Sequence, residues 1–321
     1  MSAQAYSKHL LPLLAALSLM PSAHAADSVS PAIAGVADAG SKIEFIRDGF
    51  DGTEGPIGLA DGSVLFTETK ASRITRIAAD NSISSYLENT NGANGLAFAA
   101  NGDLYAVQNL IPKVGIIYPE QHKKVLTDNF EGHNYQRPND LVLATNGGIY
   151  FTDIGVRPSA ENPNLPPANP GLYYISPAGS VKKVAADIER PNGVQLSSDE
   201  KTLYVANTAG EYILAYAIGS DGAIGKQRHF ARLAGWSQTE NGWSSGADGL
   251  AIDAEDRLYV ASSAGIEVFD KTGTALGIIP VPQKPQNLAF AGPDKKTLYI
   301  VGRGAAYKIG LKTPGYQGRA K

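Results

Sequence analysis

Apolar and polar positions repeat along this chain in one recurring pattern. Each copy starts with a polar residue, continues into a run of apolar residues, makes a tight turn and enters a second apolar run. In the clearest copy these parts follow one another between Asn139 and Asp153, with Asn146-Gly147 at the turn. The six copies begin at Glu54, Asn94, Asn139, Asn192, Asp248 and Asn287. Short strand pairs that recur at such intervals predict a β-propeller with about four strands per blade.

The turns between the apolar runs support this interpretation. Asp61-Gly62 and Asn101-Gly102 are typical of two-residue β-hairpin turns. A third, weaker strand follows most of the pairs, at residues 73–77, 114–118, 171–175, 212–216 and 265–269. No segment has the spacing of a long amphipathic helix, so we expect an all-β protein, a six-bladed β-propeller.

One further strand lies ahead of the first copy. Residues 43–47, Ile-Glu-Phe-Ile-Arg, alternate apolar and polar side chains as a half-buried strand does. In a propeller such an N-terminal strand often completes the last blade. We therefore expect it to pair beside the C-terminal strand around residues 305–309.

The start of the chain predicts an exported protein. Residues 1–25 have a weakly positive beginning, an apolar run from Leu10 to Met20 and the small-residue pattern Ala23-His24-Ala25, which together indicate a signal peptide. The apolar run is too short for a membrane-spanning helix. We expect cleavage near Ala26, a periplasmic or secreted protein, and no membrane anchor in the mature chain.

One domain accounts for nearly all of the rest, because the repeats run through it. We expect residues 26–41, rich in Ala, Ser and Gly, to be a loose leader, residues 42–312 to form the propeller and residues 313–321 to be a C-terminal tail. Two insertions lengthen the repeats: residues 155–170, with five prolines, and residues 231–246, with both tryptophans. Long loops of this kind either carry function or are tolerated surface excursions, and both interpretations stay open.

Composition removes several classes of function. The chain has 28 Lys and Arg against 31 Asp and Glu, a net charge of −3, and no basic stripe that would predict binding of nucleic acid. It has no cysteine, so export brings no disulfides and thiol catalysis is excluded. It also lacks the Gly-x-Ser-x-Gly motif of serine hydrolases. We expect a small-molecule ligand, bound by a monomer or a small homo-oligomer.

The repeat geometry gathers the first polar residue of every copy. The first strand of each blade lines the central channel of a propeller, so residues at its start meet near the axis. Two of the six residues are carboxylates, Glu54 and Asp248, and the other four are asparagines. Two carboxylates placed together would repel one another and lose their hydration unless a cation joined them. Calcium binds six to eight oxygens from carboxylates, amides and water, whereas zinc more usually takes His or Cys.

The sequence thus predicts one divalent cation in the channel, Ca²⁺ first, with Zn²⁺, Mg²⁺ and Mn²⁺ as alternatives. The opposing interpretation is that Asn-Gly and Asp-Gly are ordinary turn dipeptides. Turn formation could account for Asn94, Asn192 and Asp248, but it does not account for Glu54, or for Asn139, which no glycine follows. Because all six copies share the same phase, we favour the metal site.

Five motifs occur in order between residues 45 and 310. They are Glu54-Gly-Pro, Arg137-Pro-Asn-Asp-Leu-Val, Gly148-Ile-Tyr-Phe-Thr-Asp153, Arg190-Pro-Asn-Gly and Asp248-Gly-Leu-Ala. With them the chain resembles the family of gluconolactonases, senescence marker protein (regucalcin) and luciferin-regenerating enzyme. The resemblance implies a six-bladed propeller with one divalent metal in its central channel. It also implies that Glu54, Asn192 and Asp248 are metal ligands and that Asn139 contacts the metal or the substrate.

The function expected from this resemblance is metal-dependent hydrolysis of a lactone ring by water. Asp248 is the candidate general base, and Asn94 and Asn139 are candidates for orienting the substrate. Asp153, at the end of the second strand of its copy, either contacts the substrate at the rim or caps the strand. Two alternatives stay open for the same site: hydrolysis of a phosphotriester-like ester, and a non-catalytic binding propeller stabilised by calcium.

Overall fold

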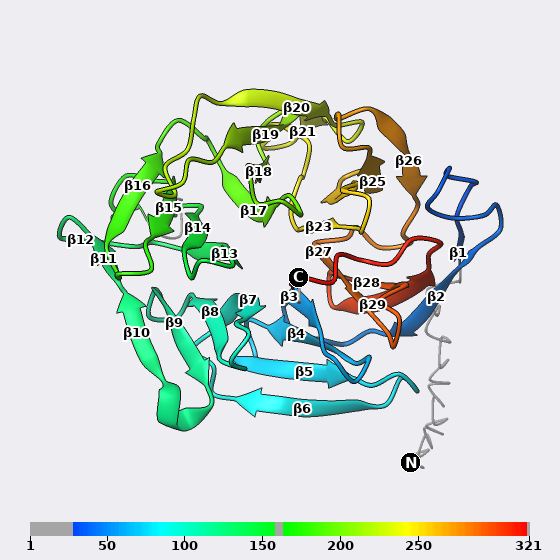
Figure 1. Cartoon of the computed structure of the whole chain (residues 1–321), viewed down its shortest axis with the longest axis horizontal. Helices are drawn as coiled ribbons and strands as arrows, with labels where there is room; N and C mark the ends of the chain where they lie inside the picture. The colour runs from blue at the N-terminus through cyan, green and yellow to red at the C-terminus, as the bar shows by residue number, and fades with distance from the viewer. Residues whose placement is uncertain (1–27, 158–162, 320–321) are drawn as a thin grey trace, which may run out of the picture.

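A computed structural model of the chain describes residues 28–157 and 163–319. Its main strands form six antiparallel sheets, which are arranged as blades around a central axis (Figure 1). The chain is therefore an all-β, six-bladed β-propeller, as the repeats predict. Two additional two-stranded hairpins and one short 3₁₀ helix lie outside the blades.

Each blade runs from an inner strand at the axis to an outer strand at the surface. Blade 1 comprises β3 (Thr53–Gly58), β4 (Val64–Glu68), β5 (Arg73–Ile77) and β6 (Ile83–Glu88). Blade 2 comprises β7 (Ala93–Phe98), β8 (Leu104–Gln108), β9 (Lys113–Tyr118) and β10 (Lys124–Thr127). Blade 3 comprises β13 (Pro138–Leu143), β14 (Ile149–Asp153), β15 (Gly171–Ile175) and β16 (Val181–Ala185).

The second half of the ring continues in the same order. Blade 4 comprises β17 (Pro191–Leu196), β18 (Thr202–Asn207), β19 (Tyr212–Ala217) and β20 (Arg228–Arg232). Blade 5 comprises β23 (Leu250–Ile252), β24 (Leu258–Ser262), β25 (Gly265–Phe269) and β26 (Ala275–Ile279). Blade 6 comprises β27 (Asn287–Ala291), β28 (Thr297–Gly302), β29 (Ala305–Gly310), β2 (Lys42–Arg47) and β1 (Ser28–Val29). The hairpins are β11 (Asn129–Phe130) with β12 (His133–Asn134), and β21 (Ser237–Thr239) with β22 (Gly242–Ser244).

Apolar side chains between the blades hold the ring together. The buried hydrophobic residues of the described chain form six clusters, and each cluster is shared by two adjacent blades. Between blades 2 and 3, for example, Val107 of β8 and Phe151 of β14 belong to one cluster. Strands such as β4, β14 and β24 are therefore buried along their whole length. This burial on both faces explains the long apolar runs in each copy of the repeat.

The last blade closes the ring with strands from both ends of the chain. β2 pairs antiparallel with β29, with Glu44 opposite Lys308 and Phe45 opposite Tyr307. This pairing confirms the prediction that residues 43–47 complete the sixth blade. β1 extends the same sheet beyond β2.

Residues 28–41 are not the loose leader that their composition suggested. Ile33 and Val36 are buried in the cluster between blades 5 and 6. The buried guanidinium of Arg257 donates a hydrogen bond to the carbonyl oxygen of Gly35 at 3.0 Å. Because the few apolar residues of this segment show no periodicity, the sequence pattern could not predict their burial.

The C-terminal tail lies across the end of the channel at which the inner strands finish. The N–H of Tyr316 donates to the carbonyl oxygen of Ile252, the last residue of β23, at 3.1 Å. The guanidinium of Arg319 donates to the carbonyl oxygen of Leu196, the last residue of β17, at 2.6 Å. Figure 1 accordingly shows the last described part of the chain, coloured red, near the centre of the ring.

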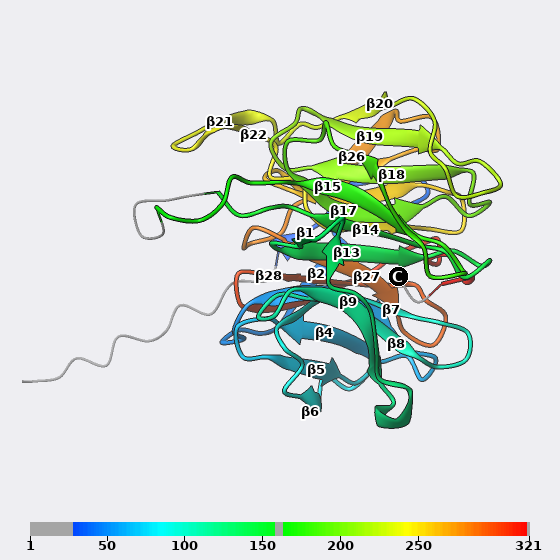
Figure 2. The ribbon, with the colours of Figure 1, turned by 90° about the vertical axis from the view of Figure 1, so that its left-hand side faces the viewer.

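Both insertions lie at the opposite end of the channel, where the inner strands begin (Figure 2). The β21–β22 hairpin projects from this end, and the rings of Trp236 and Trp243 stack there with their centroids 5.4 Å apart. Trp243 is 56% exposed. Residues 158–162 of the proline-rich insertion lie outside the described residues.

The predicted signal peptide, residues 1–25, also lies outside the described residues, so it stays a prediction. Within the described ranges, no helix has the length and hydropathy needed to cross a membrane.

Candidate active site at the channel mouth

The inner strands form a closed ring around the axis. Contacts join β3 to β7, β7 to β13, β13 to β17, β17 to β23, β23 to β27 and β27 back to β3. All six begin at the end of the channel that carries the two insertions, which we call the mouth. Glu54, Asn94, Asn139 and Asn192 are the second residues of their strands, Asn287 is the first residue of β27, and Asp248 precedes β23 by two residues. The six predicted residues therefore meet at the mouth.

A β-bulge interrupts four of the inner strands at this position. In β7 the pairing with β8 shifts between Ala93 and Leu96, so that Asn94 and Gly95 together face one residue of β8. Corresponding shifts follow Glu54 in β3 and include Asn139 in β13 and Asn192 in β17. A bulge bends its strand and redirects a side chain. In an inner strand, the bulge therefore breaks the regular alternation of side chains. A polar residue at the bulge can point in a different direction, while its neighbours stay buried between the blades.

The glycines that follow the site residues serve the packing of neighbouring blades. Gly193 lies within β17, and a Cβ there would overlap the carbonyl oxygen of Asp248 in the next blade. A Cβ on Gly249 would likewise overlap the side-chain oxygen of Asn287. These Asn-Gly and Asp-Gly pairs bring successive site residues together. Their interpretation as turn dipeptides is therefore wrong.

In blades 1 and 3, the hydroxyl group of a threonine in the second strand fixes the backbone of the next blade. Thr67 Oγ1 in β4 donates to the carbonyl oxygen of Asn94 at 3.0 Å. Thr152 Oγ1 in β14 donates to the carbonyl oxygen of Asn192 at 2.6 Å. Both threonines are fully buried. The two hydrogen bonds hold Asn94 and Asn192 at a fixed depth in the channel.

Glu54 is buried and is held by two amides of blade 6. Gln286 Nε2 donates to Glu54 Oε1 at 3.0 Å, and Asn287 Nδ2 donates to Oε2 at 3.3 Å. Burial raises the pKa of Glu54 to about 7; the two amides oppose this rise and the charge of Asp140 adds to it. The side-chain oxygen of Asn287 accepts the N–H of Leu288 at 2.9 Å. Asn287 therefore supports Glu54, and its own oxygen is already engaged.

Asp248 is the carboxylate with an unused oxygen. The residue is partly buried, but its Oδ1 atom is fully buried and has no hydrogen-bond partner among the described residues. Burial raises the pKa of Asp248 well above its ordinary value, and the charges of Glu54 and Asp140 raise it further, while Lys284 and Arg303 oppose the rise. The carboxylates of blades 1, 3 and 5 are thus close enough to act on one another.

Asp140 is a third buried carboxylate, which the sequence pattern did not single out. Its carboxylate accepts the N–H of Val194 in the next blade at 3.0 Å and that of Leu141 at 2.9 Å. It occupies the position that is glycine in Asn94-Gly95 and Asn192-Gly193. The aspartate thus departs from the repeat, and this difference could have identified it from the sequence. Asp140 joins β13 to β17 and adds negative charge beneath the mouth.

The asparagines differ in which of their atoms are free. Asn192 Nδ2 donates to Thr208 Oγ1 at 3.0 Å, so its oxygen is the atom left to face a ligand. Asn94 Oδ1 is buried and lacks a hydrogen-bond partner within the described ranges. Asn139 is buried beside Asp140 in β13. The mouth therefore presents amide oxygens next to carboxylates.

Asp153 has the capping role, and its contacts do not support the predicted contact with substrate. Its carboxylate accepts the backbone N–H groups of Gln136 and Arg137 at 2.8 Å each and that of Gly155 at 2.9 Å. Burial raises the pKa of Asp153, and these hydrogen bonds oppose the rise. The residue is 1% exposed. It fixes the chain where β13 begins and where the proline-rich insertion leaves β14.

The donor set at the mouth suits a hard cation. In the part of the chain that the structure describes, no group of three or more His, Cys, Asp or Glu side chains is arranged to hold a metal. A cation would therefore need amide oxygens as well, which Ca²⁺ accepts readily. The buried, unpartnered oxygens Asp248 Oδ1 and Asn94 Oδ1 fit such a ligand. The predicted ligands Glu54, Asn139, Asn192 and Asp248 are among the residues at the mouth that carry carboxylate or amide oxygens. The metal itself stays a prediction.

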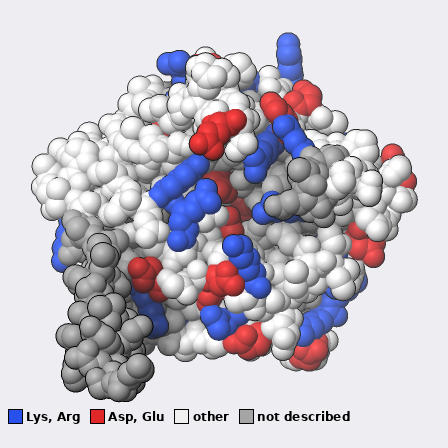
Figure 3. Space-filling view, turned by 180° about the vertical axis from the view of Figure 1, so that it is seen from behind, with Lys and Arg blue, Asp and Glu red and all other residues white. Residues whose placement is uncertain are grey.

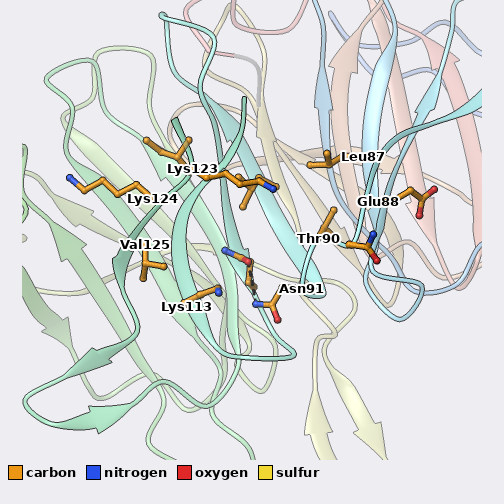
Figure 4. A pocket seen from close by; sticks show the side chains of 12 residues that line it. Leu87, Glu88, Thr90, Asn91, Lys113, Lys123, Lys124 and Val125 are labelled. Atoms are coloured by element: carbon orange, nitrogen blue, oxygen red, sulfur yellow. Dashed lines mark hydrogen bonds between the residues drawn. The ribbon is translucent and has the colours of Figure 1, made fainter. Parts of the chain in front are cut away.

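A pocket of about 310 Å³ lies apart from these residues, between blades 1 and 2 (Figure 4). Leu87 and Glu88 of β6 line one side, and Lys113 of β9 and Lys124 of β10 line the other. None of the predicted site residues lines it. It is therefore separate from the group at the mouth.

Comparisons with known proteins agree with the fold and the motifs. The family profile described as SMP-30/Gluconolactonase/LRE-like region matches residues 52–303. A gluconolactonase from Zymomonas mobilis is 27% identical over 306 residues, which cover 89% of this chain and 86% of that protein. A solved gluconolactonase from Xanthomonas campestris has a TM-score of 0.73 and 25% identity, over 89% of this chain and 97% of that one. Regucalcin from Agrobacterium tumefaciens, described as a calcium-binding protein, shares the fold, with a TM-score of 0.68 and 18% identity over 89% of this chain and 98% of that one.

Proposed function

This chain belongs to the SMP-30/gluconolactonase/LRE-like family, and from that premise we propose that it hydrolyses a lactone at the channel mouth. The observation that carries the proposal is the pair Glu54 and Asp248, carboxylates from two blades whose pKa values are raised by burial. Buried carboxylates with raised pKa values destabilise the folded protein, and they are found mainly at functional sites. The similarity to a gluconolactonase across 89% of the chain supports the substrate class.

We propose that one divalent cation, Ca²⁺ before other metals, completes the site. Glu54, Asn139, Asn192 and Asp248 would hold it through carboxylate and amide oxygens. When bound, the cation would act as a Lewis acid towards the lactone carbonyl. The repulsion between Glu54 and Asp248 would fall at the same time, because their charges would be neutralised.

The proton transfers are assigned to Asp248 as general base. Its carboxylate takes a proton from water while the water oxygen forms a bond to the lactone carbonyl carbon. The bond between that carbon and the ring oxygen then breaks, and the proton passes from Asp248 to the departing oxygen. The product is a hydroxy acid. A raised pKa suits this role, because it makes the carboxylate of Asp248 a stronger base towards water than an ordinary aspartate.

The asparagines would orient the substrate. Asn94 Oδ1 has no partner among the described residues, so it can accept a hydrogen bond from a substrate hydroxyl. Asn139 lies next to it around the ring, in the following blade. The hydrogen bond from Thr67 fixes the backbone of Asn94, and a fixed orientation of the bound substrate lowers the barrier to reaction.

A panel of lactones tests the proposal. Aldonolactones, aliphatic lactones and phosphotriesters would be offered to the protein as purified, after chelation, and after Ca²⁺ has been restored. The expected result is hydrolysis of at least one lactone, lost on chelation and regained with the metal. Turnover that survives chelation unchanged would reject the metal-dependent mechanism, and turnover of phosphotriesters alone would reject the substrate class.

We also propose that the protein is exported, because residues 1–25 have the features of a signal peptide. N-terminal sequencing of the protein recovered outside the cytoplasm should begin near Ala26. Recovery of the uncleaved chain in the cytoplasm would reject export.

A further inference from the structure

Four basic residues lie around the channel mouth, each next to the start of an inner strand. Arg137 directly precedes β13 and Arg190 directly precedes β17. Lys284 is three residues before β27. Arg303 directly follows β28, whose end lies beside the start of β27 because Val301 pairs with Asn287. The topology thus places all four at the end of the channel that holds the carboxylates.

These basic residues are near one another and near the site. The ammonium group of Lys284 lies against Gly246, two residues before Asp248, where an added Cβ would collide with it. Desolvation lowers the pKa of Lys284, the charges of Arg303 and Arg190 lower it further, and the charge of Asp248 opposes this fall. The backbone N–H of Arg303 donates to Gln286 Oε1 at 2.8 Å. Gln286 in turn donates to Glu54, so it links the backbone of Arg303 to that carboxylate.

None of the four basic side chains forms an ion pair with an acidic side chain of the described residues, although the charges of Lys284 and Arg303 act on Asp248. Arg73, Arg232 and Arg319, elsewhere on the molecule, each form an ion pair with a glutamate at 3.1 Å or less. Within the described ranges, the mouth residues form no such ion pair, and all four are exposed. Figure 3, which views this end of the molecule, shows Lys and Arg side chains gathered around the middle of the face, with acidic atoms between them. This concentration occurs in a chain whose net charge is −3.

Arg303 occupies a position that its turn does not favour. Residues 303 and 304 form the two-residue loop between β28 and β29, and Arg303 has a φ of 52°. Such a loop requires left-handed backbone at both positions, for which Asn or Gly is preferred at the first. An arginine in this conformation is strained compared with asparagine. The conformation of the turn therefore does not explain why arginine occupies this position.

The four basic residues are more than the site carboxylates need for neutralisation. The carboxylate of Asp153 is held by three backbone N–H groups, so Glu54, Asp140 and Asp248 are the mouth carboxylates left to neutralise, and the four basic residues outnumber these three. A divalent cation would increase the excess of positive charge. The carboxylates lie in the channel, whereas the basic residues are exposed at its opening. The positive charge therefore faces an incoming ligand.

We propose that the substrate carries an anionic group outside its neutral lactone ring, either a carboxylate or a phosphate, and that Arg303 and Lys284 bind this group. This inference rests on the proposed lactone hydrolysis and narrows its substrate to lactones of acidic sugars. A guanidinium binds both anions with two parallel hydrogen bonds, and an ammonium adds a point charge. The positive mouth would also speed the encounter with an anion.

The test compares three lactones that differ in charge. Glucono-1,5-lactone is neutral, 6-phosphogluconolactone carries a phosphate, and a glucaric acid monolactone carries a carboxylate. The value of kcat/KM for the preferred anionic lactone should exceed that for the neutral lactone at least tenfold in low salt. The preference should shrink as salt is added, because screening weakens exposed charges. The phosphate and carboxylate arms identify which anion is bound.

Arg303→Asn removes the charge and keeps the turn, so its melting temperature should not fall. Its kcat/KM for the anionic lactone should drop roughly 10- to 100-fold, as expected when a charged hydrogen bond is lost. The drop for the neutral lactone should be at least ten times smaller. Lys271→Asn is the matched control, since Lys271 is exposed in the turn after β25 at the opposite end of the channel. This control should leave all rates unchanged.

Equal kcat/KM values for neutral and anionic lactones, or identical behaviour of Arg303→Asn and Lys271→Asn, would overturn the inference and leave lactone hydrolysis standing. If no lactone is opened, calorimetric titration with glucarate separates the two ideas. Binding that Arg303→Asn abolishes would keep the anion site and reject the lactone chemistry. Absence of binding would reject both.

Discussion

Replacement of Glu54 by glutamine should stabilise the metal-free protein at neutral and alkaline pH. The carboxyl of Glu54 is 8% exposed, and its pKa is raised from 4.5 to about 7 by burial. The folded protein therefore holds the Glu54 proton to a higher pH than the unfolded chain does. As the pH rises from 4.5 to 7, the unfolded chain releases this proton first, so the free energy of unfolding falls. Above pH 7 the loss is complete.

The magnitude follows from the same two pKa values. The difference between 4.5 and about 7 corresponds to a loss of about 3 kcal/mol, at roughly 1.4 kcal/mol for each pKa unit. Glutamine cannot ionise and avoids this loss. It has one oxygen where Glu54 has two, so one of the hydrogen bonds from Gln286 and Asn287 disappears, at a cost of about 1 kcal/mol. The net gain for Glu54→Gln at pH 8 is about 2 kcal/mol.

The assay is urea unfolding at pH 5 and pH 8, with chelator and then with Ca²⁺. With chelator, the natural protein should lose stability between the two pH values, whereas Glu54→Gln should change much less. With Ca²⁺ the order at pH 8 should reverse, because a ligand that binds the folded state stabilises it and the variant has lost a metal-binding oxygen. Equal pH dependence of the two proteins would refute the raised pKa, and an unchanged order with Ca²⁺ would refute Glu54 as a ligand.

Two further substitutions test the site. Asp248→Asn should keep the fold and lower kcat by about 10²- to 10⁴-fold, the usual contribution of a general base, measured by lactone hydrolysis and circular dichroism; full activity would end this assignment. Gly193→Ala should lower the free energy of unfolding by about 1–3 kcal/mol and also lower activity, because the new methyl group overlaps the carbonyl oxygen of Asp248. Gly310→Ala, where an added Cβ meets nothing within 4 Å, is its control, and equal effects of the two alanines would contradict the packing role.

The inner part of each blade could be predicted from the sequence because its strands are buried on both faces. β4 and β14, for example, each begin with three apolar residues shortly after a turn. Outermost strands such as β6, which has no fully buried residue, mix apolar with polar side chains, so no period distinguished them from loops. Residues 28–41 were mispredicted for a related reason, since Ile33 and Val36 are buried by blades far along the chain.

The candidate site was predictable to the extent that it repeats. The shared phase of the six copies located Glu54 and Asp248, which lie in different blades and act on one another. Asp140 and Gln286 were missed because their roles occur in one blade only, so no repetition marked them. The carboxylate of Asp153 was ambiguous, because a strand-end cap and a ligand contact call for the same residue type. Only its three hydrogen bonds to backbone N–H groups decide between the two.

The sixth blade also determines when the molecule can finish folding. Its outer strands β2 and β1 come from the beginning of the chain and its inner strands β27–β29 from the end, so that Glu44 faces Lys308. During synthesis, the edge of β2 that pairs with β29 has no partner until β29 has left the ribosome. Contacts over such a sequence separation form slowly. The nascent ring therefore stays open, with an unpaired strand edge exposed, until its last segment arrives.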